Sequence, residues 1–179
     1  MTNHQRGRLT RAVAGNSRIV GVLAALPLLG MLAVGPGTAN AAVLRLNSAV
    51  PYLCADVSEA AITNLTPVGA FYCNGDFNQQ WEYIDGQFVG IGTTKGVNKC
   101  LDIHGAGPNP PGTVVELFDC NGGANQQWSI FNGALRGLPS SNLIYNPQSG
   151  LCLDASGGKG AQLTIERCTG SSSQNWRLE

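Results

Sequence analysis

The sequence predicts an all-β domain with pseudo-threefold symmetry, preceded by a segment for export. Three observations support this fold class. A motif of Cys, Asp and Trp occurs three times, short hydrophobic runs alternate with Gly, Asn, Pro and Ser clusters, and no amphipathic helical period of three or more turns follows Ala42. Short β-branched or aromatic runs bounded by turn residues are typical of strands, whereas a helix would place apolar residues three and four positions apart.

The first 41 residues differ in composition from the rest of the chain. Residues 1–18 contain four arginines and no acidic residue, and the uncharged apolar run Ile19–Val34 follows. Ala39-Asn40-Ala41 has the small-x-small pattern that signal peptidase accepts, so we expect a secretory signal peptide over residues 1–41, cleaved after Ala41, and a secreted protein. A membrane anchor is the alternative, but the apolar run is shorter than the roughly 20 residues that a spanning helix needs.

Residues 42–179 are enough for one compact domain and too few for two. This part holds all eleven Asp and Glu but only seven of the eleven Lys and Arg, which gives a formal net charge of −4. A mildly acidic domain lacks the basic stripe that a phosphate backbone requires, so nucleic acid is not expected as a partner. No membrane span is expected in the mature form.

The repeated motif organises the whole mature chain. Each copy has Cys-x-Asp, a Gly- and Asn-rich stretch, a hydrophobic run that ends in a second Cys, and a polar loop leading to Gln-x-Trp; the tryptophans are Trp81, Trp128 and Trp176. A copy of about four strands is too small to bury its apolar face alone. We therefore predict three repeats, about residues 43–88, 89–135 and 136–179, closed as a six-stranded barrel with a hairpin cap and a shared tryptophan interior.

All six cysteines lie in the mature part, and an even number in an oxidising compartment predicts disulfides. The simplest of the fifteen pairings lies within repeats, where each bond would close a loop of about 15 to 20 residues and add roughly 3 kcal/mol: Cys54–Cys73, Cys100–Cys120 and Cys152–Cys168. A zinc site is the alternative, but the chain has no Cys-x-x-Cys pair, and His104 has no second histidine nearby in sequence. Neither a metal nor another cofactor is expected.

The Cys-Leu-Asp and Gln-x-Trp pattern, repeated three times, resembles the ricin-B (R-type) lectin family of carbohydrate-binding modules over about residues 43–179. The resemblance implies a β-trefoil and a lectin that recognises glycans or polysaccharides. In that family each repeat can hold one shallow sugar site. The site uses the Asp of Cys-x-Asp, a polar residue four before the second Cys, an aromatic two before it, and the Asn before Gln-x-Trp. A carboxylate accepts hydrogen bonds from sugar hydroxyls, an amide donates and accepts them, and an aromatic face covers the C–H side of a pyranose.

The resemblance places the main site in the second repeat, with Asp102, Glu116, Phe118, Asn125 and Gln126 in these roles. Gln126 is expected to hold the loop and also to contact ligand. Glu116 replaces the Gln that is more usual in the family, so it removes a donor and adds a second carboxylate near Asp102. Strand alternation alone leaves open whether Phe118 faces the ligand or the core, and Asp102 could cap a turn instead of binding. His104 is interpreted as a solvated loop residue.

The first repeat is a further candidate site, although Gly69 stands at its polar position, and its residues are Asp56, Phe71, Asn78 and Gln79. The third repeat keeps Asp154 but lacks the aromatic residue and the Asn. It has Thr164, Glu166 and Ser173 at the remaining positions. We therefore interpret the third repeat as structural.

Two other function classes are weighed against a lectin. A protein-binding or protease-inhibitor trefoil is the first, because the same architecture hosts protein ligands. A glycosidase is the second, supported only by the carboxylate pair Asp102 and Glu116. The chain has no Gly-x-Ser-x-Gly, His-Glu-x-x-His or phosphate-loop motif, so no enzyme is expected. Most relatives are joined to catalytic domains, which leaves room for a separate enzyme or toxin as a partner.

Overall fold

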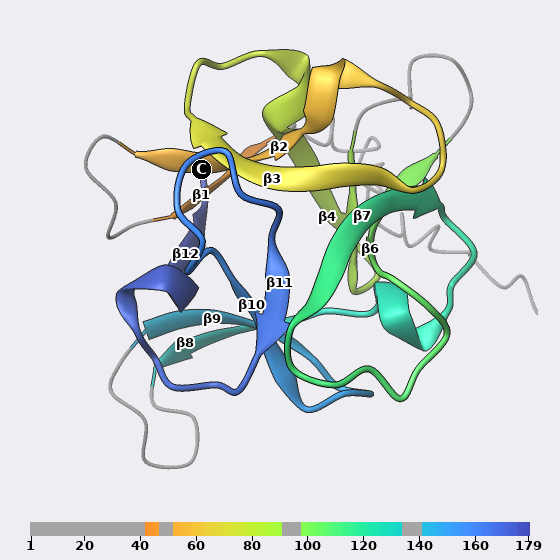
Figure 1. Cartoon of the computed structure of the whole chain (residues 1–179), viewed down its shortest axis with the longest axis vertical. Coiled ribbons are helices and arrows are strands. Elements are labelled where there is room, and N and C mark those ends of the chain that lie inside the picture. Colours follow the sequence, from red (N-terminus) through yellow and green to blue (C-terminus); the bar gives the residue numbers. More distant parts are fainter. Residues whose placement is uncertain (1–41, 47–51, 91–97, 134–140) are drawn as a thin grey trace, which may run out of the picture. The chain divides into compact units, whose positions relative to one another are not determined.

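The computed structural model describes residues 42–46, 52–90, 98–133 and 141–179. The expected signal peptide and its cleavage position after Ala41 lie outside these described residues. Within the described ranges the regular secondary structure consists of strands and short 3-10 turns, joined by loops (Figure 1). No helix in these ranges has both the length and the apolar character needed to cross a membrane.

Each repeat supplies four strands. The first repeat contains β1 (Ala42–Leu46), β2 (Leu53–Val57), β3 (Thr66–Tyr72) and β4 (Gln80–Ile84). The second contains β5 (Gln87–Val89), β6 (Lys99–Ile103), β7 (Thr113–Asp119) and β8 (Ser129–Gly133). The third contains β9 (Ser141–Asn146), β10 (Leu151–Asp154), β11 (Thr164–Glu166) and β12 (Trp176–Leu178). A 3-10 turn precedes the last strand of each repeat, and one more follows β2: η2 (Phe77–Gln79), η4 (Ala124–Gln126), η5 (Ser172–Gln174) and η1 (Ser58–Ala60).

The two middle strands of each repeat form an antiparallel hairpin, and the three hairpins contact one another. Strand β7 pairs with β3 through Thr66 and Leu117 and with β11 through Thr164 and Val114. A backbone bridge between Gly69 and Gln162 joins the third hairpin to the first. In Figure 1, β3, β7 and β11 lie around a common centre. The hairpins therefore form one cap with pseudo-threefold symmetry.

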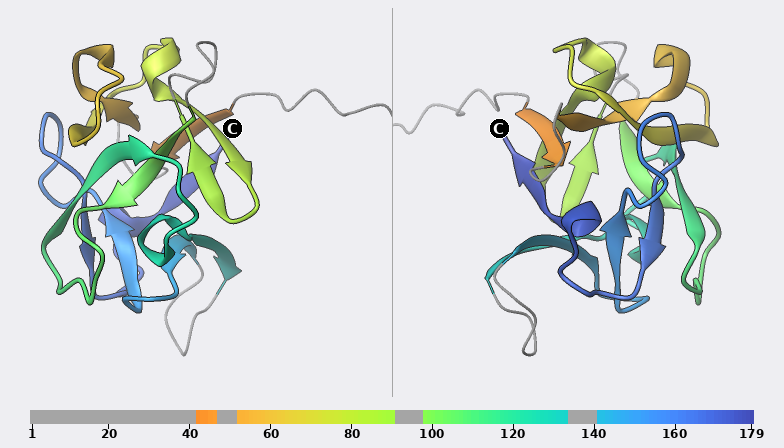
Figure 2. Two further views of the ribbon diagram at one scale, coloured as in Figure 1. Left: turned by 90° about the vertical axis from the view of Figure 1, so that its right-hand side faces the viewer. Right: turned by 60° about the vertical axis from the view of Figure 1, so that its left-hand side comes forward.

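The outer strands join each repeat to the next. Strand β4 pairs with β5, β8 with β9, and the first strand β1 with the last strand β12. Figure 2 shows the β4–β5 hairpin in yellow-green, and β1 in orange beside β12 in blue. Pairing of β1 with β12 links the two ends of the described domain, so the repeats close on themselves. The predicted β-trefoil of three four-stranded repeats is confirmed.

The tryptophans of the three motifs lie in the interior, as predicted. Each is at most 1% exposed and belongs to one hydrophobic core cluster: Trp81, Trp128 and Trp176. A buried indole N–H needs an acceptor, and each Nε1 donates to the carbonyl that follows the first Cys of its own repeat. These carbonyls belong to Ala55, Leu101 and Leu153, at 3.1, 3.0 and 2.9 Å. Each tryptophan is thus tied to its own hairpin.

Disulfides close the same hairpins at their open ends. The structure contains Cys54–Cys73, Cys100–Cys120 and Cys152–Cys168, the pairs that the repeat spacing predicted. Within the described residues no cysteine is free. Each bond joins the start of a hairpin to a cysteine one or two residues after its end, which restricts the loop that leads to Gln-x-Trp.

A buried glutamine completes each repeat through a set of hydrogen bonds that we call the Gln clasp. In the second repeat, Gln126 Nε2 donates to Asp102 Oδ2 at 2.8 Å and to the Asp119 carbonyl at 2.9 Å. Its Oε1 accepts from the Asn121 backbone N–H at 2.9 Å. The clasps of Gln79 and Gln174 have equivalent partners, including Asp56 at 2.8 Å and Asp154 at 2.9 Å. All three glutamines are at most 1% exposed.

Loss of one clasp should destabilise the fold. Gln126→Ala removes a donor from the buried carboxylate of Asp102 and one partner each from the Asp119 carbonyl and the Asn121 N–H, so we expect the free energy of unfolding to fall by about 1–3 kcal/mol. Gln127→Ala is the matched control, because the adjacent amide makes no side-chain hydrogen bond within the described residues, and it should change stability by less than about 0.5 kcal/mol. Urea unfolding with disulfides intact measures both, and equal losses would contradict a structural role for the clasp.

Candidate functional site

The second-repeat hairpin brings together the acidic and aromatic residues predicted from the sequence. Asp102 in β6 lies directly opposite Glu116 in β7, and both side chains are almost fully buried, at 3% and 5% exposure. Phe118 follows two residues after Glu116 and therefore shares its face of the strand. Leu117, between them, is fully buried in the core, whereas Phe118 is half-buried. Phe118 therefore faces outward.

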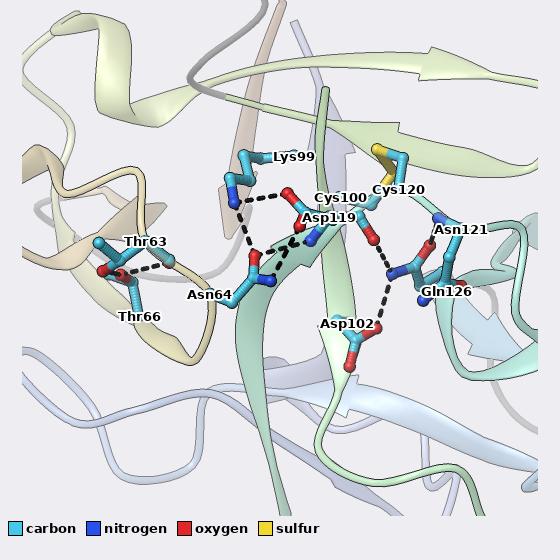
Figure 3. Close-up of polar contacts among 10 residues, drawn as sticks. All are labelled: Thr63, Asn64, Thr66, Lys99, Cys100, Asp102, Asp119, Cys120, Asn121 and Gln126. Atoms are coloured by element: carbon cyan, nitrogen blue, oxygen red, sulfur yellow. Dashed lines mark hydrogen bonds and ion pairs between the residues drawn. A yellow bond between two sulfur atoms is a disulfide. The ribbon is translucent and has the colours of Figure 1, made fainter. Parts of the chain in front are cut away.

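Asn125, in the turn η4, donates hydrogen bonds to the carboxylate of Asp102. Its Nδ2 lies 3.0 Å from each oxygen of Asp102 and 3.0 Å from the carbonyl oxygen of Ile103, and it donates to these acceptors. The clasp residue Gln126 approaches the same carboxylate from the interior (Figure 3). Asp102 is therefore held in one orientation by two amide side chains.

These residues border a hollow of about 350 Å³ on the second repeat. That volume is close to the lower end of the range for small-molecule sites. The lining residues are Leu65, Asp102, His104, Gly105, Ala106, Glu116, Phe118, Asn121 and Asn125. Four of the five residues predicted for this repeat are among them. Gln126 is not, since it is fully buried behind Asp102, and its place in the structure is that of a support for the carboxylate.

The environment of the hollow changes the pKa of Asp102. The pKa of Asp102 is raised from 3.8 to about 6, mainly by burial and also by the charge of Glu116. Hydrogen bonds from Gln126 and Asn125 and the nearby His104 act in the opposite direction and favour the ionised form of Asp102. Asp102 therefore changes its charge within a mildly acidic range of pH.

His104 has a contact that the sequence analysis did not predict. Its Nδ1 lies 3.0 and 3.2 Å from the two oxygens of Glu116, and its ring borders the hollow. The side chain is 58% exposed and follows the end of β6, so His104 is also the solvated loop residue that the sequence predicted. The signal was available in the spacing, because His104 follows Asp102 by two positions along an extended strand end and so falls on the same face. Each carboxylate of the pair thus has its own partners.

The first-repeat residues come together in part. Gln79 donates to Asp56, and Asn78 donates to the Val57 carbonyl at 3.0 Å. Phe71 is 43% exposed, but the Lys159 ammonium of the third repeat lies 5.1 Å from the centre of its ring. This is a cation–π contact. A sugar on this face would have to displace Lys159.

A close backbone approach explains Gly69 at the position opposite Asp56. A Cβ on this residue would lie 3.0 Å from the carbonyl oxygen of Ala161 in the third repeat. The same loop donates from Gly160 N–H to the Ala70 carbonyl at 2.7 Å. A side chain here would require the Ala161 backbone to move by a few tenths of an ångström, so packing between repeats disfavours the polar residue that the second repeat has at this position.

The third repeat uses its carboxylate internally. Asp154 accepts hydrogen bonds from the Ser156 N–H, Ser173 Oγ and Gln174 Nε2, at 2.6, 3.2 and 2.9 Å. The residue opposite Asp154 is Thr164, and the residue at the aromatic position is Glu166. This geometry fits the structural role predicted for the repeat. Among the described residues, no group of three or more His, Cys, Asp or Glu is placed to hold a metal ion.

A model of the ricin-type β-trefoil lectin domain matches residues 42–176. A search of curated protein sequences returned no match. Among solved structures, the designed threefold-symmetric protein ThreeFoil has 26% identity and a TM-score of 0.60, covering 76% of this chain and 96% of its own.

Two plant proteins are also similar. The agglutinin from Abrus precatorius has 27% identity and a TM-score of 0.59 over 81% of this chain and 51% of its own. A non-toxic homologue of type II RIPs from Momordica charantia, solved with α-methyl-D-galactoside, has 24% identity and a TM-score of 0.57. The match covers 78% of this chain and 47% of that protein. The chain thus spans about half the length of each plant protein. Because the family model covers most of the sequence, the chain belongs to the ricin-type β-trefoil lectin family and carries a carbohydrate-binding lectin domain.

Proposed function

We propose that the protein is a secreted lectin, without catalytic activity of its own, that binds glycans or polysaccharides mainly through the second repeat. The hollow at this repeat carries the proposal. It combines the buried carboxylates of Asp102 and Glu116 with the outward ring of Phe118 and the amide of Asn125. Secretion is supported by the leader pattern of residues 1–41 and by the three disulfides.

Binding would use the two kinds of surface that a pyranose presents. The carboxylate of Asp102 accepts hydrogen bonds from sugar hydroxyls, and its orientation is already set by Asn125 and Gln126. The ring of Phe118 covers C–H groups on the opposite side of the polar contacts. Because these groups are held before the ligand arrives, little additional ordering is needed on binding.

Each site is expected to be weak for a single sugar. A shallow site of this kind binds monosaccharides with about millimolar to sub-millimolar Kd, or roughly −4 to −5 kcal/mol. Polymers or clustered glycans raise the apparent affinity when more than one site is engaged. The first repeat, with Asp56, Phe71, Asn78 and Gln79, is a weaker second site, because Lys159 lies over its ring.

Sugar titration of the purified protein tests the proposal. Methyl α-D-galactoside, N-acetylgalactosamine, xylose, galactan and xylan form the panel, with isothermal titration or affinity electrophoresis as the measurement. We expect binding to at least one of them, lowered about tenfold by Phe118→Ala, since an aromatic contact contributes roughly 1–1.5 kcal/mol. Asp102→Asn should also lower it, because one acceptor oxygen becomes a donor.

Phe131→Ala is the matched control, because Phe131 is a half-buried phenylalanine of the same repeat that does not line the hollow. It should leave sugar affinity unchanged. Absence of binding to every sugar, or equal losses for both phenylalanine variants, would argue against the site. Capture of a protein partner that free sugars do not compete away would favour the protein-binding class, and release of reducing sugar from the polysaccharides would favour the glycosidase.

Sugar affinity should depend on pH through Asp102. Its pKa of about 6 means that the accepting carboxylate is present above pH 6 and becomes protonated below it. If only the ionised form binds, about one tenth of the protein is competent at pH 5, and affinity there should be about tenfold below its value at pH 7. Titrations at half-unit steps between pH 4.5 and 8 measure the midpoint. A flat profile would contradict the role of Asp102.

Glu116→Gln provides the control for this profile. Removing the Glu116 charge takes away one cause of the raised pKa of Asp102, so the midpoint should move to lower pH. Protonation of Asp102 does not itself destabilise the folded state at low pH. A carboxyl whose folded pKa lies above 3.8 binds its proton more tightly in the folded state, so its contribution to stability is present below 3.8 and is lost as pH rises through about 6.

A further inference from the structure

Leu65 belongs to the first repeat but borders the hollow of the second. It precedes β3, and its N–H donates to the Leu117 carbonyl of β7 at 2.9 Å. Strands β3 and β7 are antiparallel, with Thr66 opposite Leu117. One further step in this register places Leu65 beside Phe118. The hollow is therefore bounded by apolar side chains from two repeats.

The conformation of Leu65 is unusual for an exposed apolar residue. Its side chain is 55% exposed, and its φ of +68° lies in the left-handed region, which leucine rarely adopts. Such a backbone costs about 1–3 kcal/mol and persists only where the surroundings enforce it. Burial in the core does not supply the compensation here, because most of the side chain is outside it.

A buried lysine holds the turn that carries Leu65. Lys99, at the start of β6, is 5% exposed, and its Nζ donates to Asn64 Oδ1 at 2.6 Å and to Asp119 Oδ1 at 2.7 Å (Figure 3). Asn64 Nδ2 donates to Asp119 Oδ2 at 2.9 Å, and the Asp119 N–H donates to Asn64 Oδ1 at 2.9 Å. Lys99 and Asn64 hold the pKa of Asp119 below its usual range, so the carboxylate is charged.

The turn is also closed on itself. Thr66 Oγ1 donates to the Thr63 carbonyl at 2.8 Å, and the two threonine hydroxyls lie 3.0 Å apart (Figure 3). Residues on both sides of Leu65 are thus fixed, one to the second-repeat hairpin and one within the turn. This arrangement buries a charged ammonium, which is costly unless it is fully paired. The structural consequence is a leucine side chain held at the edge of the hollow.

We propose that Leu65 is a ligand-contacting residue of the second-repeat site, contributed by the first repeat, and that Lys99 is a positioning residue that acts through Asn64. Leu65 meets the C–H surface of the sugar at the side of the hollow next to Phe118, while Asp102 meets the hydroxyls. The site therefore requires two neighbouring repeats. This inference rests on the lectin function proposed above.

Leu65→Ala tests the contact, since alanine has the same difficulty with a positive φ and changes only the side chain. Titration with methyl α-D-galactoside, N-acetylgalactosamine and xylose should show a three- to tenfold loss of affinity for the sugars that the unmodified protein binds. Ile84→Ala is the matched control, because Ile84 is a 42% exposed aliphatic residue of β4 outside this hollow. It should leave the affinities unchanged.

A double-mutant cycle tests Lys99. Lys99→Met should lower affinity by a similar factor, but it should cause no further loss in the Leu65→Ala background, because Lys99 acts through Leu65. Asn64→Ala takes the place of Lys99→Met if that variant does not fold. If the affinity losses of the two single variants multiply in the double variant, Lys99 affects binding independently of Leu65, and this would overturn its positioning role.

The outcomes separate this inference from the proposed function. Failure of the unmodified protein to bind any of the three sugars or the two polysaccharides would overturn both. Sugar binding that is lost in Phe118→Ala but retained in Leu65→Ala would overturn the inference and leave the second-repeat site standing. Perturbation of the Leu65 methyl NMR signals on addition of a sugar that binds, with those of Ile84 unchanged, would support a direct contact.

Discussion

The fold depends on how each repeat places a carboxylate at the edge of its hydrophobic core. A buried carboxylate is costly without donors. Asp102 and Asp154 are buried and Asp56 is half-buried, and the Gln clasp gives each of them a donor from a fully buried side chain. The same amide binds the backbone on both sides of the second Cys, and the tryptophan two positions later binds the hairpin through its indole. One short motif thereby joins loop, hairpin and core.

The clasp also explains what the sequence predicted well. The Gln-x-Trp motif recurs at intervals of 47 and 48 residues, and each copy has its Cys-x-Asp and second Cys in the same order, so the repeats, the tryptophan interior and the disulfide pairs were predictable from the sequence. The facing pairs Asp102 with Glu116 and Cys100 with Phe118 follow from hairpin register and the two-residue period of a strand. Contacts between repeats were not predictable in this way. Lys99 contacts Asn64 across 35 positions, and Lys159 of the third repeat lies over the ring of Phe71. No pattern of neighbouring residues in the sequence indicates either contact.

The three repeats share the clasp but differ on their outer faces, because the fold requires only the inward partners. In the first repeat, the close approach of the Ala161 backbone favours glycine at position 69. In the third repeat, Ser156 N–H and Ser173 Oγ donate hydrogen bonds to the carboxylate of Asp154. The second repeat alone of the three combines the carboxylate with a facing polar residue, an outward aromatic ring and an amide. Its neighbour adds Leu65, so the difference between repeats also reflects which loops pack beside each hairpin.

The two carboxyl groups of the second repeat are better suited to holding a sugar than to cleaving one. A glycosidase places its acid and its nucleophile or base on either side of the scissile bond. Asp102 and Glu116 face each other across one hairpin and belong to the same face of it, so a ligand in the hollow meets both from one side. Their partners differ as well, since amides orient Asp102 and His104 pairs with Glu116. A proton acquired by Asp102 at mildly acidic pH leaves its carboxyl group with fewer acceptor sites for sugar hydroxyls.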